Sequence, residues 1–373
     1  MNLEKNQIHM LKKMMEESFK QDDLYTAGNY WKHYEKNIIK QVENNSLKHF
    51  RSWEGGAGLG NIQSFGGGDE RIGRNFMRNF HPFDKDFKFF DNSFIVRKYN
   101  SLINKLIPYF SFFKYFAIRA AEARRYHKEY FDGFIFQKYN LIKELDKELA
   151  EISDSSFGLE KDNFTLINNK IYTSLFLDHL LFIHQIKKNT EFEAINYILE
   201  LGAGTGLLAS AFLKLNKKIK YLIIDIPPTI FFSEYYLKNI GYKVFGYEDL
   251  IKTNVLNIKK IFEDYDAICL PSWKLNHLDD FQFDLFINIH SFQEMEKKQT
   301  MNYLSILKKN FKKYIYLENT IEGHKKALKK NEFGVLEQCK LEDVEDFLSR
   351  EFNIIKKDIN RLDKNYKLLL KKK

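Results

Sequence analysis

The spacing of apolar residues changes once along the chain, close to residue 190. Before that position apolar residues recur every three to four residues, which is the period of an amphipathic helix. The pattern predicts helices at 3–20, 24–50, 94–106, 109–128 and 135–151, and no strand of convincing length. We therefore expect residues 1–190 to form a helical N-terminal lobe.

From residue 197 onward, short apolar runs alternate with helical segments, which is typical of a parallel sheet flanked by helices. The pattern predicts strands at 197–201, 220–225, 242–246, 266–270, 283–289, 313–318, 353–358 and 365–370. Helices are expected at 205–216, 228–240, 296–311 and 341–350. The last two strands are separated by a short turn and should form an antiparallel hairpin. Residues 191–373 are thus predicted to be an α/β domain.

Residues 53–68 interrupt the helical pattern, because seven of the 18 glycines of the chain fall in this stretch. So many glycines exclude a helix interior and predict a loop. One interpretation is a simple surface connection. The flanking aromatic residues Trp53 and Phe65 favour a lid or substrate loop instead.

Composition narrows the class of protein. The chain has 59 Lys and Arg against 50 Asp and Glu, a net charge of +9, and its lysines are scattered, which predicts a solvated surface and no nucleic-acid partner. It has no apolar run of transmembrane length and no signal-like start, so we expect a cytoplasmic protein without membrane insertion. Cys269 and Cys339 lack the spacing of a metal site, and neither zinc nor a disulfide is predicted.

The arginines are distributed differently, since eight of the ten lie between residues 51 and 125. A guanidinium group can hold a phosphate with two parallel hydrogen bonds, which an ammonium group cannot. We therefore expect Arg71 and Arg74, with Arg51 and Arg78 as further candidates, to bind a phosphate on the acceptor. The alternative is that these arginines pair with acidic residues of their own lobe or face solvent.

The main chemical signal is an apolar strand followed by glycines, in the sequence YILELGAGTG at 197–206. Gly202 and Gly204 allow positive φ and a close approach of the backbone to a ligand, and the following helix offers free amide donors. Leu207 stands where a dinucleotide fingerprint would have its third glycine, so a nicotinamide cofactor is disfavoured. The pattern predicts that a polar ligand binds at this turn.

Asp225 ends the next strand, nineteen residues after Gly206. An acidic side chain at this place can accept hydrogen bonds from both hydroxyl groups of an adenosine ribose. The turn and the acidic strand end together predict a nucleoside-type cofactor. The alternative is a tight turn with a surface aspartate.

Four segments resemble the bacterial sugar O-methyltransferase family: ELGAGTG at 200–206, YLIIDIPPTIFFSEYYL at 221–237, AICLPSW at 267–273 and FDLFINIHSFQEM at 283–295. The resemblance covers about residues 135–320. It implies a Rossmann-like class I methyltransferase fold with a seven-stranded sheet, S-adenosyl-L-methionine as cofactor and a sugar hydroxyl as methyl acceptor.

The expected cofactor site combines this resemblance with the positions of the strand ends. Its residues are Glu200, Gly202, Ala203, Gly204, Gly206, Asp225, Ile226, Trp273 and Asn288. The resemblance implies that Glu200 faces the methionine end of the cofactor; the alternative is a carboxylate that stabilises the turn. Trp273 ends a strand on the adenine side, where it can stack on the base or pack in the core.

The acceptor side is expected at the end of the strand 283–289, because ligands of open parallel sheets lie beyond the carboxyl ends of the strands. A hydroxyl group needs a base to remove its proton, and His290 and Glu294 are the candidates. If a helix begins here, Glu294 shares a face with His290 and can orient it or act itself; neither residue acting is the remaining alternative. Ser291, Gln293 and Asn288 can bind substrate hydroxyls or cap the loop, and Asn319, after the following strand, is expected to border the acceptor pocket. No carboxylate cluster predicts a metal.

We therefore expect an O-methyltransferase that acts on a sugar, and the resemblance implies a precursor of a surface polysaccharide, nucleotide-activated if the arginines bind phosphate. The alternatives are a methyltransferase for another small molecule or a phosphoryl-type acceptor, and a non-catalytic nucleotide-binding partner protein. The sequence leaves open the sugar, the hydroxyl group and the oligomeric state.

Overall fold

The centre of the molecule is an eight-stranded sheet with the order β5-β6-β4-β3-β7-β8-β10-β9. The computed structural model describes residues 3–45, 47–52, 131–160, 163–360 and 364–373. The strands are β3 (Tyr197–Leu201), β4 (Lys220–Asp225), β5 (Val244–Phe245), β6 (Ala267–Pro271), β7 (Phe283–Ile289), β8 (Phe311–Thr320), β9 (Phe352–Asn360) and β10 (Asn365–Lys372). All eight predicted strands are present.

Strand direction matches the expected fold class. Neighbouring strands from β5 to β8 are parallel, whereas β10 is antiparallel to both β8 and β9, which forms the predicted hairpin. This is the arrangement of a Rossmann-like class I methyltransferase sheet. The sheet has eight strands where seven were expected, because the two-residue strand β5 is added at one edge.

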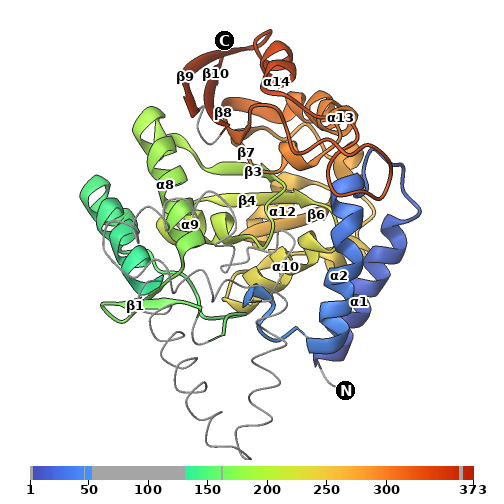
Figure 1. Cartoon of the computed structure of the whole chain (residues 1–373), viewed down its shortest axis with the longest axis horizontal. Helices are drawn as coiled ribbons and strands as arrows, with labels where there is room; N and C mark the ends of the chain where they lie inside the picture. Colours follow the sequence, from blue (N-terminus) through green and yellow to red (C-terminus); the bar gives the residue numbers. More distant parts are fainter. Residues whose placement is uncertain (1–2, 46, 53–130, 161–162, 361–363) are drawn as a thin grey trace, which may run out of the picture.

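Helices cover both faces of the sheet. They are α8 (Ser174–Asn189), α9 (Leu207–Leu215), α10 (Thr229–Asn239), α11 (Tyr247–Leu250), α12 (Ile258–Asp264), α13 (Lys297–Leu307) and α14 (Leu341–Leu348). The connection from β3 to β4 contains α9, and the connection from β7 to β8 contains α13; the two run toward opposite edges of the sheet. Because such connections between parallel strands are right-handed, α9 and α13 lie on opposite faces of the sheet. Figure 1 shows α9 and α10 on one side of the strands and α13 and α14 on the other.

The register brings the carboxyl ends of three strands together. Leu201 of β3 lies opposite Ile224 of β4, and Glu200 lies opposite Ile287 of β7. β3 therefore lies between β4 and β7. The strands β4, β5 and β6 lie on one side of β3, and the later strands from β7 onward lie on its other side, so the strand order reverses at β3. Ligands of open parallel sheets bind at such a switch point.

The N-terminal part is mainly helical as predicted, but the helix α8 and a β-hairpin were not predicted. It contains α1 (Leu3–Ser18), α2 (Asn29–Asn45), the 3₁₀ turn η1 (Phe50–Ser52), a helix over 131–145 and α7 (Lys147–Ala150). The β-hairpin consists of β1 (Thr165–Ile167) and β2 (Lys170–Tyr172). The helices expected at 94–106 and 109–128 and the loop 53–68 lie outside the described residues.

The N-terminal helices are bound to the α/β part of the chain (Figure 1). The Asn29 side chain donates hydrogen bonds to the carbonyl oxygens of Glu332 and Gly334, at 2.7 and 2.8 Å. The Gln299 side chain donates to the carbonyl oxygen of Thr26 at 2.9 Å. These contacts cross the domain boundary predicted near residue 190, and that boundary stays a prediction. No helix in the described part of the chain is long and apolar enough to cross a membrane.

Candidate functional site

The glycine turn after β3 has the backbone conformation that its sequence predicts. Gly202, Gly204 and Gly206 have φ angles of 79°, 61° and 75°, a region in which other residues are strained. Gly206 also forms the N-terminal cap of α9. A Cβ atom on Gly202 would collide with the Ser291 side chain. The turn therefore lies directly against the segment that follows β7.

Asp225 joins the end of β4 to this turn. Its carboxylate accepts hydrogen bonds from the backbone N–H of Gly204 at 3.0 Å and of Ile226 at 2.7 Å. Ser233 of α10 donates to the carbonyl oxygen of Gly204 at 2.7 Å. Burial raises the pKa of Asp225 to about 6. The structure thus brings Asp225 to the turn, as its spacing indicated, while the contact with a ribose remains a prediction.

Glu200 is the second carboxyl group of the site. It is buried on β3 and accepts a hydrogen bond from the Tyr221 hydroxyl at 2.8 Å. Burial raises the pKa of Glu200 to about 8, and the nearby charge of Asp225 raises it as well. Its hydrogen-bond partner is a neutral hydroxyl, and no cation among the described residues stabilises its charged form.

The end of β7 is tied to its neighbours by amide side chains. Asn288 donates hydrogen bonds to the Leu201 carbonyl oxygen and to Ser291 Oγ, both at 2.8 Å. Its own Oδ1 accepts from the Asn319 side chain at 3.0 Å and from the Phe292 N–H at 3.2 Å. Asn288 and Asn319 are both fully buried. A contact of either side chain with a ligand would require this network to open.

His290 lies just beyond β7 in a strained backbone conformation. Its φ is 57°, and its N–H donates to the Glu318 carbonyl oxygen at 2.7 Å. A positive φ is uncommon at a non-glycine residue, and strained backbone conformations cluster at functional sites. The ring lies against Phe182, with 6.3 Å between centroids, and burial lowers the pKa of His290. Its imidazole is therefore neutral at pH 7 and able to accept a proton.

Glu294 is separated from His290 by the local backbone. The segment forms only one 3₁₀ turn, Phe292–Glu294, and not the α-helix that would place both side chains on one face. His290 is hydrogen-bonded to Gln293, whereas the partners of Glu294 are Tyr30 and Trp31 of α2. The expectation that Glu294 orients the imidazole is thus not met in this structure. Burial raises the pKa of Glu294 to about 8, and Asp225 contributes to the rise.

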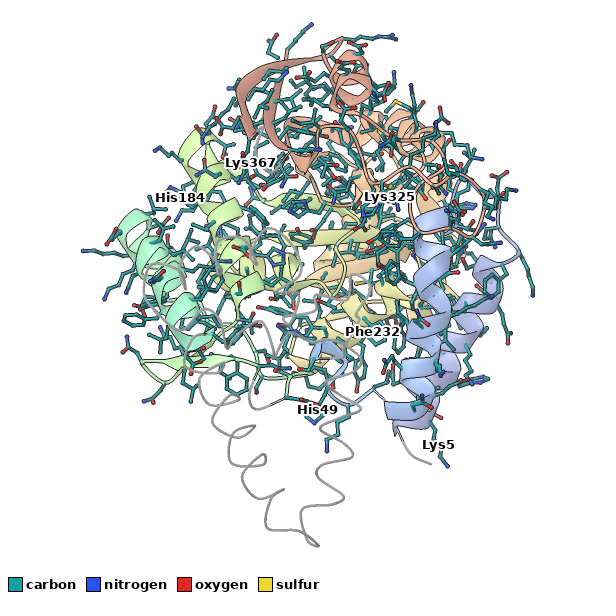
Figure 2. All side chains as sticks on the ribbon, viewed as in Figure 1. Lys5, His49, His184, Phe232, Lys325 and Lys367 are labelled. Carbon is teal, nitrogen blue, oxygen red and sulfur yellow. The ribbon has the colours of Figure 1, made fainter. Side chains whose placement is uncertain are left out.

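Tyr30, Trp31 and His324 were missed by the sequence analysis. The Tyr30 ring lies 4.5 Å from the His324 ring, and Nδ1 of His324 is buried without a hydrogen-bond partner. Figure 2 shows the neighbouring Lys325 beside the upper part of α2. The one usable signal was the concentration of aromatic residues in NYWKHY at 29–34. Nothing in that signal pointed to a segment more than 260 residues away.

Gln293 and Trp273 occupy the two sides of the site. The side-chain oxygen of Gln293 accepts a hydrogen bond from the Thr320 N–H at 2.8 Å, and the backbone carbonyl oxygen of Gln293 accepts one from the His324 N–H at 2.9 Å. Trp273 follows β6 in the 3₁₀ turn Ser272–His277 and is buried. Its place at the end of β6 suits both alternatives, stacking on a base and core packing.

Arg51 does not take part in binding a phosphate. Its Nη2 lies 2.8 Å from Asp154 Oδ2, and both side chains are buried. Nη1 donates to the Ser155 carbonyl oxygen at 2.9 Å, and the guanidinium lies over the Tyr236 ring. The expectation for Arg51 is therefore wrong, because a buried aspartate needs the guanidinium as its partner. Arg71, Arg74 and Arg78 lie outside the described residues.

The described residues contain no group of three or more His, Cys, Asp or Glu side chains that could hold a metal ion.

Comparison with known proteins gives distant structural similarities only. No family model and no curated protein matches the sequence. The mitomycin 7-O-methyltransferase MmcR is 11% identical with a TM-score of 0.35, and the match covers 53% of this chain and 57% of that one. An S-adenosylmethionine-dependent methyltransferase from Clostridium acetobutylicum is 14% identical with a TM-score of 0.34, covering 51% and 89%. Magnesium protoporphyrin IX methyltransferase (ChlM) from Synechocystis is 11% identical with a TM-score of 0.35, covering 67% and 96%.

The chain thus spans less than two thirds of the length of the mitomycin enzyme. Similarities at these identities and TM-scores indicate neither a substrate nor a mechanism. The function of this chain therefore has to be inferred from its own strand order, its glycine turn and the side chains around them.

Proposed function

We propose that this protein is an S-adenosylmethionine-dependent O-methyltransferase. The observation that carries the proposal is the glycine turn with two buried carboxyl groups beside it: Asp225 accepts a hydrogen bond from the Gly204 N–H at 3.0 Å, Glu200 lies just before the turn on β3, and the described hydrogen-bond partners of both are neutral. A site that leaves carboxylates without a cation favours a positively charged ligand. S-adenosylmethionine brings two such charges, the sulfonium and the α-ammonium group.

The residues at the turn fit this cofactor. The left-handed glycines allow the ligand to approach the backbone, and the α9 N-terminus offers free amide donors. Asp225 would accept the ribose hydroxyls, Glu200 would face the methionine end, and Ile226 and Trp273 would border the adenine. When bound, the cofactor supplies an electrophilic methyl group. The remaining chemistry, removal of a proton from the acceptor hydroxyl, belongs to this chain.

We assign the role of general base to Glu294, with His290 as the alternative. The charge of Asp225, at the expected cofactor site, acts on Glu294, whereas the charges that act on His290 are those of Glu318 and Lys367. A base is most effective when its pKa lies close to the working pH, and a value of about 8 meets that condition. His290 has its contacts on the other side, with Phe182 and Glu318.

The acceptor we propose is a sugar hydroxyl, and the resemblance of the sequence supports a precursor of a surface polysaccharide. Arg71 and Arg74 support a nucleotide-activated form, because arginine binds phosphate bidentately. Methylation of another small molecule or a phosphoryl-type acceptor is the second candidate. A non-catalytic nucleotide-binding protein is the third.

The test has two steps. Calorimetry should show that the purified protein binds S-adenosylhomocysteine, and absence of binding to the folded protein would refute the cofactor assignment. Release of S-adenosylhomocysteine should then appear with sugars or nucleotide-linked sugars. Release with other small molecules alone favours the second candidate, and binding without any release favours the third. Replacement of Arg71 or Arg74 by Lys should raise KM for a nucleotide-linked sugar but not for the free sugar.

A further inference from the structure

The first turn of α2 reaches the carboxyl group that we assign as the base. Tyr30 and Trp31 are the second and third residues of α2. The Tyr30 ring lies 4.5 Å from the His324 ring, and the His324 N–H donates to the backbone carbonyl oxygen of Gln293, the residue before Glu294. The side chains of Tyr30 and Trp31 both lie close enough to Glu294 to lower the pKa of its carboxyl group as hydrogen-bond donors. A phenol and an indole can each donate one hydrogen bond to a carboxylate. An N-terminal helix therefore contributes directly to the surroundings of a residue at the end of β7.

The position of this turn relative to Glu294 is fixed from both sides. The Asn29 N–H donates to Glu296 Oε1 at 3.3 Å, and Glu296 lies two residues after Glu294. On the opposite side, Asn29 Oδ1 accepts from the Asn331 N–H at 2.8 Å, while the Asn29 side chain binds the Gly334 carbonyl oxygen. Gln299 holds the residues before α2 through Thr26. The donors of α2 are thus held in place and not merely adjacent to Glu294.

The Tyr30 side chain is enclosed by rings. Its centroid lies 5.1 Å from Tyr34, 4.5 Å from His324 and 5.4 Å from Phe333. Burial and the negative charge of Glu294 raise the pKa of Tyr30 well above its ordinary range. The hydroxyl therefore stays protonated at every working pH, and its single proton can be donated to Glu294 or to Tyr34, its second hydrogen-bond partner.

We propose that Tyr30 and Trp31 are positioning residues of the methyl-transfer site, which orient the Glu294 carboxylate toward the acceptor hydroxyl through their hydrogen bonds. The inference rests on the proposed function, because it takes Glu294 as the base. It makes α2 a part of the active site and not only a cover of the sheet. Burial raises the pKa of Glu294, and the two donors limit that rise because they stabilise the charged form.

The test removes one donor at a time and leaves an aromatic ring at each position, the same ring in Tyr30→Phe and a smaller one in Trp31→Phe. In Tyr30→Phe and Trp31→Phe the Glu294 carboxylate loses a donor, so its pKa rises and the acidic limb of the pH profile of kcat/KM moves to higher pH. We expect about a tenfold loss of turnover at neutral pH, with recovery at alkaline pH where the base is ionised. Affinity for S-adenosylhomocysteine should stay within about twofold of wild type. Phe333→Leu is the matched control, because Phe333 contacts the same Tyr30 ring but is not a partner of Glu294.

A second readout does not depend on turnover. Titration of ¹³C-labelled glutamate carboxyls by NMR, with Glu294 assigned through Glu294→Gln, should show a higher pKa of Glu294 in both donor variants and an unchanged one in Phe333→Leu. An unchanged Glu294 titration in the donor variants, or an activity loss that is equal at all pH values, overturns the inference. If the protein fails to bind S-adenosylhomocysteine while the Glu294 titration does shift, the proposed function fails and the contact of α2 with Glu294 stands.

Discussion

The Asp225 carboxylate accepts a hydrogen bond from the backbone N–H of Gly204 at 3.0 Å, so the end of β4 and the glycine turn form one unit. A ligand that binds to the turn therefore also meets the Asp225 carboxylate. Because this carboxylate supports the turn as well, a substitution at Asp225 affects both the ligand contact and the shape of its site.

We expect Asp225→Ala to weaken S-adenosylhomocysteine binding by about 1.5 to 3 kcal/mol, the range for hydrogen bonds to a charged group. Asp225→Asn keeps one acceptor oxygen and should lose less. Calorimetry gives both affinities, and thermal melting shows that the variants are folded. Equal affinity of wild type and a folded Asp225→Ala protein would remove Asp225 from the cofactor site.

Gly202→Ala should disturb the turn more than the strain of its positive φ alone would. The new methyl group would collide with the Ser291 side chain, in addition to the strain of a φ of 79°. Gly241→Ala is the matched control, because Gly241 has a φ of 101° but open space around its Cβ position. We expect Gly241→Ala to lower stability by about 1 kcal/mol without a change in cofactor affinity. Gly202→Ala should lower both, and similar cofactor affinities in the two variants would contradict the predicted contact.

The parallel strands were predictable because both faces of the sheet are covered. All five residues of β6 are buried, as are all but the first of β4. Strands buried on both sides appear in the sequence as continuous apolar runs. The hairpin of β1 and β2 was missed because its strands have only three residues each. Its turn, Asn168-Asn169, has φ angles of 51° and 60° and is a recognisable hairpin signal.

The candidate site was predictable only in part. The glycine turn follows β3, and Asp225 is the last residue of the next strand, β4. Because the two strands are parallel neighbours, their carboxyl ends meet at the same edge of the sheet, which made this part of the site predictable. The relation of His290 to Glu294 depends on whether the intervening residues form an α-helix or a 3₁₀ turn, which the spacing alone does not decide. The contact of Glu294 with Tyr30 and Trp31 joins segments that no periodic pattern connects.

The unliganded protein should lose stability as the pH rises from about 6.5 to about 8. Burial raises the pKa of Glu200 to about 8, so in this range the folded state holds a proton that the unfolded chain has released. The free energy of unfolding therefore falls as pH rises toward that pKa. Burial lowers the pKa of His179 to about 3, so near pH 6.5 the unfolded chain binds a proton there that the folded state does not. This opposite slope is the same in wild type and in a Glu200 variant, so it cancels when the two are compared.

Glu200→Gln should make this dependence shallower, because the amide does not titrate and still offers an acceptor to the Tyr221 hydroxyl. Part of the slope should remain, because burial also raises the pKa of Glu294 to about 8. Urea unfolding at the two ends of the range measures the slope in each protein. A slope that is the same in wild type and in Glu200→Gln would show that Glu200 is not protonated in the folded state.

Substitutions at the two candidate bases should separate their roles. Glu294→Gln should lower kcat by about 10²- to 10⁴-fold, the usual effect of removing a positioned base, while cofactor affinity is retained. His290→Ala should have a smaller effect on kcat, because its described contacts are with Phe182, Gln293 and Glu318. The measurement is turnover with chemistry shown to be rate-limiting. The reverse order of effects would transfer the role of base to His290.

Arg51→Ala should destabilise the protein by about 3 to 5 kcal/mol, because it leaves the Asp154 carboxylate buried without its partner. The Asp154 carboxylate also accepts hydrogen bonds from Thr173 at 2.7 Å and from Tyr236 at 3.2 Å, so the loss affects contacts to α8 and α10 together. Phe50, next to Arg51, stacks on Phe232 of α10 with 5.2 Å between the ring centroids.

Arg350→Ala is the control, since Arg350 is exposed, and its effect should stay within about 0.5 kcal/mol. Urea unfolding gives both values. KM for a nucleotide-linked acceptor should not change in Arg51→Lys at a temperature where this variant is folded. A raised KM there, with stability intact, would return Arg51 to the acceptor site despite its ion pair with Asp154.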